Sequence, residues 1–121
     1  MHAAVQQLPE TEMLSQIEKE CLLACNECAA ACLECASACL KEDDPKAMVH
    51  CIKLDMECAD VCRFAATAIA RGDAHMKAVC LLCAQVCKDC ATECAKHAMV
   101  HCQHCAQACQ RCAEACASMA S

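Results

Sequence analysis

Nineteen cysteines recur along the 121-residue chain with spacings that alternate mostly between three and four residues. This alternation places the side chains on one face of an α-helix. Three of the four cysteine blocks follow it without interruption, and they consist of Cys21, Cys25, Cys28, Cys32, Cys35 and Cys39; Cys80, Cys83, Cys87, Cys90 and Cys94; and Cys102, Cys105, Cys109, Cys112 and Cys116. The pattern predicts helices that each carry one stripe of thiols.

The remaining block, second in the chain, has fewer cysteines but keeps the same period. Cys51, Cys58 and Cys62 share a helical face, and Asp55 occupies the step at which a cysteine is missing. An acid on a stripe that faces a protein core needs a partner or a metal ion, because burying an unpaired charge is costly. Asp55 is therefore a candidate metal ligand alongside these three thiols.

Proline, glycine and acidic residues separate the blocks. Pro9 suits the first turn of a helix, Asp44 with Pro45 predicts an N-cap and first helical position, and Gly72 with Asp73 predicts a helix stop followed by a new N-cap. No glycine or proline separates the last two blocks, so a turn is placed there because one straight helix would leave its stripe unpaired. The expected helices are 9–41, 45–71, 74–97 and 100–119.

These expectations define an all-α fold. Alanine, the strongest helix former, fills many of the remaining positions. Short connections between long helices make neighbours antiparallel, which predicts an up-down-up-down four-helix bundle with a cysteine-lined core. We expect one metal-binding domain over residues 9–121, preceded by an N-terminal segment over residues 1–8.

Composition excludes several classes of partner. A net charge of −6 and a single aromatic residue, Phe64, argue against nucleic-acid binding. The sequence contains no uninterrupted run of about 18 apolar residues, which would predict a membrane span, and the N-terminus has no secretory signal pattern. The expected compartment is therefore the cytoplasm, where thiols stay reduced and are available to bind metals.

The metal is predicted from charge and spacing. Soft thiolates select Cu(I), zinc or iron–sulfur clusters. One monovalent ion per thiolate leaves a buried core neutral, whereas each zinc tetrathiolate would leave a doubly negative site. Zinc and iron–sulfur sites also favour cysteines clustered in loops, while this chain has eight helical C-x-x-x-C pairs: 21/25, 28/32, 35/39, 58/62, 83/87, 90/94, 105/109 and 112/116.

We therefore expect Cu(I) storage or sequestration, with many ions per chain and no enzymatic activity. Two alternatives stay open at this point. One is a zinc or cadmium buffer of the metallothionein type, and the other is an iron–sulfur or thiol redox protein. Capacity distinguishes the first hypothesis, since a carrier of single ions would need only one exchangeable site.

The four cysteine-striped helices, the repeated C-x-x-x-C pairs and the stretch KHAMVHCQHCAQACQRCAEAC resemble the four-helix-bundle copper storage family over residues 9–119. The sequence shows no export signal, and in this respect it resembles the cytosolic branch of that family. The resemblance implies a homotetramer whose bundles each hold many Cu(I) ions, mostly through cysteine pairs, with a few other ligands near one end of the core.

Topology gathers the candidate ligands of that kind at one end of the bundle. Asp55, His97, His101 and His104 lie where the first and third helices end and the second and fourth begin, and we call this the histidine end. The alternative for the histidines is that they interact with helix dipoles or water. We expect copper to enter here.

The other end is expected to be closed by apolar side chains, namely those of Leu14, Ile17, Phe64, Ile69, Met76 and Met119. Three leucines fall away from the cysteine stripes and are expected to form contacts between subunits: Leu23, Leu81 and Leu82.

Overall fold

The computed structural model describes residues 14–121, and within them the chain forms four α-helices and one short 3-10 helix. The α-helices are α2 (Gln16–Cys39), α3 (Val49–Arg71), α4 (Met76–Cys94) and α5 (Val100–Ala120), and the 3-10 helix η2 (Pro45–Met48) precedes α3. The expected domain boundary between residues 8 and 9 lies outside the described residues.

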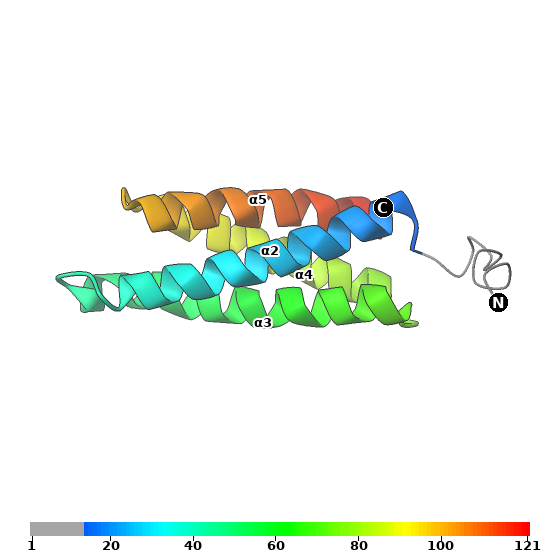
Figure 1. The fold of residues 1–121 in the computed structure, drawn as a ribbon, viewed down its shortest axis with the longest axis horizontal. Coiled ribbons are helices and arrows are strands. Elements are labelled where there is room, and N and C mark those ends of the chain that lie inside the picture. Colours follow the sequence, from blue (N-terminus) through cyan, green and yellow to red (C-terminus); the bar gives the residue numbers. More distant parts are fainter. Residues whose placement is uncertain (1–13) are drawn as a thin grey trace, which may run out of the picture.

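The helices form an antiparallel bundle (Figure 1). Helices α2 and α4 each pack against both α3 and α5, so α2 and α4 occupy diagonal corners of the bundle. Consecutive helices are neighbours, as short connections require. The predicted up-down-up-down four-helix bundle is confirmed.

The first helix begins later than predicted. Ser15 is its N-cap, and its hydroxyl accepts a hydrogen bond from the backbone N–H of Glu18 at 3.1 Å. The Glu18 carboxylate accepts one from the Ser15 N–H at 2.8 Å, which completes a capping box. Leu14 is not helical, so the expected continuous helix from Pro9 is wrong in these residues, and Pro9 itself lies outside the described part of the chain.

The turn between α3 and α4 is partly as predicted. Gly72 is the C-cap of α3 and adopts the left-handed conformation, with φ 65°, which ends the helix as predicted. Asp73 does not cap α4, because its carboxylate is paired with the Arg71 guanidinium at 2.7 Å, and His75 takes the N-cap position without a side-chain bond. Helix α4 therefore begins at Met76 instead of 74.

Before α3, Pro45 starts a 3-10 helix and not the expected continuous α-helix, and Asp44 makes no capping bond with its side chain. The last connection spans residues 95–99 because α4 ends at Cys94, three residues before the expected end at residue 97, while α5 begins at Val100 as expected. There the Gln103 amide donates hydrogen bonds to the carbonyl oxygens of Ala95, at 3.2 Å, and His97, at 2.6 Å. These bonds satisfy carbonyls that a helix end leaves free, so the turn forms without glycine or proline.

Helix α2 is long and apolar enough, by length and composition, to cross a membrane, and it is the one such helix among the described residues. The sequence expectation of no such segment is therefore too strong. Cysteine and alanine supply much of the apolar character of α2, and its cysteines face the other three helices in the core. A helix in the core of a protein can have the same length and apolar composition as a membrane span.

Candidate metal centre

All nineteen cysteine side chains are fully buried, with 0% exposure, and all are free thiols. Each of the four helices directs its stripe toward the bundle axis, so the thiols form a continuous column inside the protein. The predicted cysteine-lined core is confirmed. Alanines and a few larger residues, such as Met48 and Ile69, complete the core.

Seven of the eight C-x-x-x-C pairs bring their sulfur atoms within 3.8–4.0 Å of each other along one helix. In the remaining pair, Cys21 and Cys25 each approach Cys116 of α5, at 3.6 Å. The spacing of four residues thus places neighbouring thiols one turn apart, as expected from helix geometry.

Sulfur atoms from different helices approach at least as closely as those within one helix. Cys62 of α3 lies 3.5 Å from Cys87 of α4, and Cys28 of α2 lies 3.6 Å from Cys109 of α5. Two ligands of one ion with metal–sulfur bonds of about 2.3 Å are separated by about 3.8 Å in tetrahedral and about 4.6 Å in linear geometry. The sulfur positions are therefore suited to shared ions both along and between helices.

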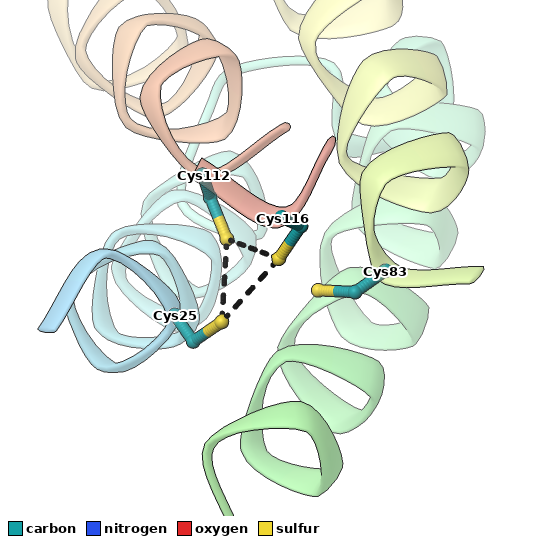
Figure 2. A group of neighbouring side chains, drawn as sticks. All are labelled: Cys25, Cys83, Cys112 and Cys116. Carbon is teal, nitrogen blue, oxygen red and sulfur yellow. Dashed lines mark hydrogen bonds between the residues drawn. The ribbon is translucent and has the colours of Figure 1, made fainter. Parts of the chain in front are cut away.

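Several groups of four cysteines have all their sulfur atoms within 4.8 Å of one another. Figure 2 shows one of them, in which Cys25 of α2, Cys112 and Cys116 of α5 and Cys83 of α4 point toward one another. Other groups share members, so a filled core requires sulfur atoms that bridge ions. These overlapping groups are Cys28, Cys32, Cys58 and Cys109; Cys28, Cys62, Cys87 and Cys112; and Cys32, Cys90, Cys105 and Cys109.

Burial raises the pKa of several thiols in the metal-free core. Desolvation is the largest cause that raises the pKa of Cys80 and of Cys102 to about 11, and it also raises the pKa of Cys39. Desolvation therefore favours the neutral, protonated form of these three thiols near pH 7. A monovalent ion that replaces a thiol proton leaves the charge of the site unchanged, whereas a divalent ion on four thiolates leaves two uncompensated negative charges.

Asp55 lies inside the column with 0% exposure. Its Oδ1 atom accepts hydrogen bonds from the thiols of Cys90, Cys94 and Cys105, each at 3.3 Å. Burial and then the adjacent Cys105 and Cys90 raise the pKa of Asp55 to about 10. The acid is therefore neutral near pH 7 in the metal-free protein, and its oxygen takes the place of a sulfur in the stripe of α3.

Of the three histidines predicted as ligands, one faces the thiols. The Nδ1 atom of His101 lies 3.5 Å from the sulfur of Cys102, 3.6 Å from that of Cys35 and 3.9 Å from that of Cys39. These four residues form another group whose ligand atoms lie within 4.8 Å of one another. The Nε2 atom of His101 is 3.0 Å from a carboxylate oxygen of Glu42.

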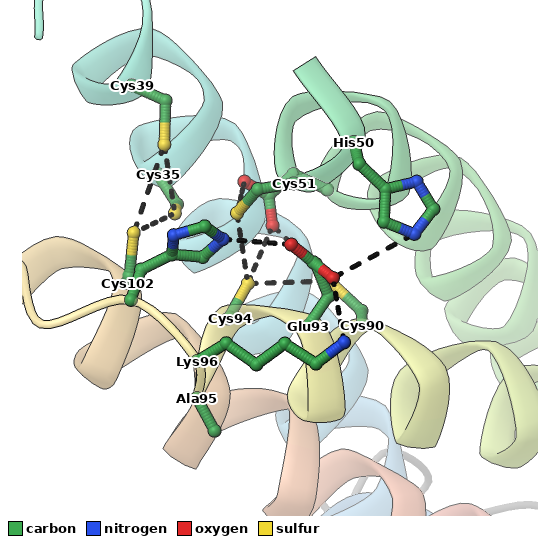
Figure 3. Close-up of polar contacts among 12 residues, drawn as sticks. Cys35, Cys39, His50, Cys51, Cys90, Glu93, Cys94, Ala95, Lys96 and Cys102 are labelled. Carbon is green, nitrogen blue, oxygen red and sulfur yellow. Dashed lines mark hydrogen bonds and ion pairs between the residues drawn. The ribbon is translucent and has the colours of Figure 1, made fainter. Parts of the chain in front are cut away.

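Of the other two histidines at the same end, His97 has 19% of its side chain exposed and His104 is exposed. His97 pairs through Nε2 with a Glu93 carboxylate oxygen at 2.8 Å, and this bond holds the pKa of Glu93 below its usual range. His104 is exposed and makes no hydrogen bond with the described core thiols. Figure 3 shows Glu93 between His50 and Lys96, beside a cluster of core cysteines at the histidine end.

The opposite end is closed by fewer residues than expected. Ile69 is fully buried, Met119 is 8% exposed, and Leu14 and Met76 pack against the core as partly buried residues. Two of the expected residues do not contribute. Phe64 is 51% exposed and points outward, because it follows Cys62 by two residues, about 200° around the helix. Ile17 is 57% exposed and lies in the first turn of α2, beyond the thiols.

Two acidic residues at the histidine end, Glu42 and Glu93, escaped the sequence analysis. Glu42 lies in the connection between α2 and η2, where no periodic pattern indicates its direction. Glu93 lies four residues before His97, and that spacing on one helix face could have indicated the pair.

The fold and this column of ligand atoms define a four-helix bundle with an interior built to bind soft metal ions. A sequence profile described as copper storage protein matches residues 14–121. The chain belongs to the copper storage protein family, which confirms the resemblance drawn from its cysteine stripes.

Solved structures of this family superpose on the chain. Metal-free copper storage protein 3 from Bacillus subtilis is 46% identical, with 85% of this chain and 98% of that chain covered and a TM-score of 0.79. A cytosolic copper storage protein from Streptomyces lividans, solved with five coppers, is 39% identical, with 87% and 92% covered and a TM-score of 0.84. A structure of the Streptomyces lividans protein loaded with 10 copper equivalents is 35% identical, with 98% and 96% covered and a TM-score of 0.86.

Proposed function

We propose that this protein stores Cu(I) in its interior, with many ions held per chain as cargo. The observation that carries the proposal is the continuous column of nineteen buried, free thiols, whose sulfur atoms lie at metal-binding distances within and between helices. Thiolates are soft ligands and suit Cu(I). Membership of the copper storage family, with copper-loaded structures of its relatives, supports the same function.

The proposed ligands are all nineteen cysteines, with Asp55 inside the column and His101 at its end. We assign His97 and His104 a transient role at the histidine end, where ions pass between solvent and the column. The partial exposure of the His101 side chain, at 22%, supports this end as the entrance. Buried Ile69 and Met119 close the other end.

The protein acts by binding and release, without turnover of a substrate, and it works in the cytosol. A related protein from Streptomyces lividans is described as cytosolic and as a copper storage protein. Reducing conditions would also keep the closely spaced thiols available, because cytosolic thiols are maintained in the reduced state.

A zinc or cadmium buffer is the second candidate, and the groups of four mutually close cysteines favour it. Its weakness is charge, since divalent ions on shared thiolates leave negative charge inside a dry core. Competition between Zn²⁺ and Cu(I) for the same reduced protein decides between the two candidates.

Anaerobic titration of the reduced protein with Cu(I), against a chromophoric chelator, is expected to show tight uptake of more than about ten ions per chain, because soft thiolates line the whole core. The far-ultraviolet circular dichroism should be that of a helical protein before and after loading. A tenfold excess of Zn²⁺ should leave the Cu(I) capacity unchanged. Saturation at a few Cu(I) ions, or displacement of Cu(I) by Zn²⁺, would contradict storage of copper.

We further propose that the bundles assemble into a homotetramer. Leu23 of α2 is 66% exposed, and Leu81 and Leu82 of α4 are 63% and 51% exposed. Because α2 and α4 lie at diagonal corners, these leucines occupy two separate faces. A tetramer with dihedral symmetry needs more than one self-complementary interface, and the two apolar faces supply candidates for them.

Light scattering coupled to size exclusion is expected to give a mass of about four times the 12.9 kDa of the chain, since two self-complementary faces close a tetramer. Leu23→Glu should reduce the tetramer to dimers by placing a charge in one interface, without loss of copper capacity. Gln107→Glu adds the same charge at an exposed position of α5 and should leave the tetramer intact. A wild-type monomer would contradict the assembly.

A further inference from the structure

Glu42 binds the outward nitrogen of the histidine that faces the thiol column. The Nε2 atom of His101 lies 3.0 Å from Oε2 of Glu42, and the two side chains are 22% and 34% exposed. Glu42 belongs to the connection between α2 and η2, whereas His101 lies in the first turn of α5. The contact therefore fastens this connection to α5 at the histidine end of the core.

The contact determines which His101 nitrogen carries the proton. An ionised carboxylate only accepts hydrogen bonds, so Nε2 must be the donor. In the neutral imidazole the other nitrogen, Nδ1, then presents a lone pair. That lone pair is directed at the sulfur atoms of Cys102, Cys35 and Cys39, at 3.5–3.9 Å.

This arrangement matches the way in which proteins orient histidine ligands. A metal-binding histidine commonly donates its second N–H to a carboxylate, which fixes the ring orientation and raises the basicity of the binding nitrogen. Here the carboxylate, the ring and three thiols follow one another from the surface inward. No other described carboxylate hydrogen-bonds to His101.

We propose that Glu42 is a positioning residue for copper uptake: it holds His101 so that Nδ1, with the thiols of Cys35, Cys39 and Cys102, forms the first Cu(I) site that an entering ion meets. Glu42 acts through His101 and does not touch the ion. The inference rests on the proposed storage of Cu(I) and adds the residue that organises its entrance.

A weaker entrance site slows uptake. An ion that pauses at the entrance before moving inward is transferred at a rate proportional to the occupancy of that site. Loss of a carboxylate behind a metal-binding histidine typically lowers metal affinity 10- to 100-fold. At this partly exposed pair the lower limit applies, so Glu42→Ala is expected to slow uptake about tenfold when Cu(I) is limiting.

The test follows, without oxygen, the transfer of Cu(I) from a chromophoric chelator complex to an excess of reduced protein. Glu42→Ala should be slow, whereas Glu42→Gln should stay close to the wild-type rate because its amide oxygen still accepts the Nε2–H bond. Glu34→Ala is the matched control, since Glu34 is an exposed glutamate near the end of α2, just before the connection that carries Glu42, and makes no hydrogen bond to His101.

A double-mutant cycle shows whether Glu42 acts through the histidine. His101→Ala should be at least as slow as Glu42→Ala, and adding Glu42→Ala to His101→Ala should cause no further loss. Long-range ¹⁵N NMR of the metal-free protein should show His101 protonated at Nε2 in the wild type and in Glu42→Gln, with this preference reduced in Glu42→Ala.

Wild-type uptake in Glu42→Ala, or an equal slowing by Glu42→Ala in the presence and absence of His101, would overturn the positioning role. Equal slowing in Glu42→Gln would overturn it as well, since it would assign the effect to the charge of Glu42. The end-point capacity of the same protein samples is measured separately, with Cu(I) in excess over the protein. A low capacity in the wild-type protein would instead refute the proposed storage function.

Discussion

Cu(I) loading is expected to move thermal unfolding of this protein beyond about 90 °C, the range of hyperstable domains. The metal-free core consists largely of cysteine and alanine, which bury little hydrocarbon per residue. Its buried polar side-chain atoms all have partners among the described residues, so the reduced protein folds, but with limited hydrophobic stabilisation. Bound copper then joins all four helices through sulfur atoms that the unfolded chain does not hold together.

The size of this effect follows from linkage. Each site filled at a thousand times its dissociation constant stabilises the folded state by about 4 kcal/mol, and each kcal/mol shifts the midpoint of a domain of this size by about 4 °C. A few filled sites therefore raise the midpoint by tens of degrees. The measurement is anaerobic calorimetry of the reduced protein with increasing Cu(I).

Two controls accompany the calorimetry. Removal of copper by excess chelator should return the midpoint to that of the metal-free protein, and the same excess of Zn²⁺ should give a smaller shift. An unchanged midpoint on Cu(I) loading would mean that the ions bind the unfolded chain as well as the folded one, which a preformed interior column does not allow.

Asp55→Asn is expected to stabilise the metal-free protein at pH 7 by up to roughly 4 kcal/mol. The pKa of Asp55 is raised from 3.8 to about 10 in the folded state. Between these two values the folded protein binds one more proton than the unfolded chain, so its stability falls as pH rises, by about 1.4 kcal/mol per pH unit. Asparagine has the same shape, carries no charge and keeps an oxygen that accepts the thiol hydrogen bonds.

Urea unfolding of the reduced, metal-free proteins at pH 5, 6 and 7 measures this difference. The wild type should lose stability over this range, and Asp55→Asn should change much less. Asp60→Asn is the matched control on the same helix: its side chain is 78% exposed, and a surface substitution typically changes stability by less than about 0.5 kcal/mol. A wild-type stability that stays level from pH 5 to pH 7 would show that Asp55 ionises freely.

The same variant separates the stability of the bundle from copper binding. The Oδ1 atom of Asp55 lies among the sulfur atoms of Cys90, Cys94 and Cys105. An amide cannot become an anionic ligand, so Asp55→Asn should weaken binding in this layer while the rest of the column keeps its capacity. A more stable protein with one weaker site is therefore the expected combination.

Helical periodicity determined much of the fold from sequence alone. The alternating spacing of three and four residues assigned every cysteine to an inward stripe, and each one is buried. The end of α3 at Gly72 was also predictable, because a residue without a side chain adopts the left-handed conformation without strain. The start of α2 at Gln16 was missed although the capping box of Ser15 and Glu18 is visible in the sequence.

Only the tertiary structure decided which thiols meet between helices and which histidine faces them. His101 and His104 each precede a stripe cysteine by one residue, so their local sequence positions are equivalent. His101 lies in the first turn of α5, where the end of α2 and Glu42 cover its ring and direct Nδ1 to the thiols. His104 lies one turn further along and is exposed. Periodicity is a property of one helix, whereas the surroundings of a side chain at its edge depend on the neighbouring helices and connections.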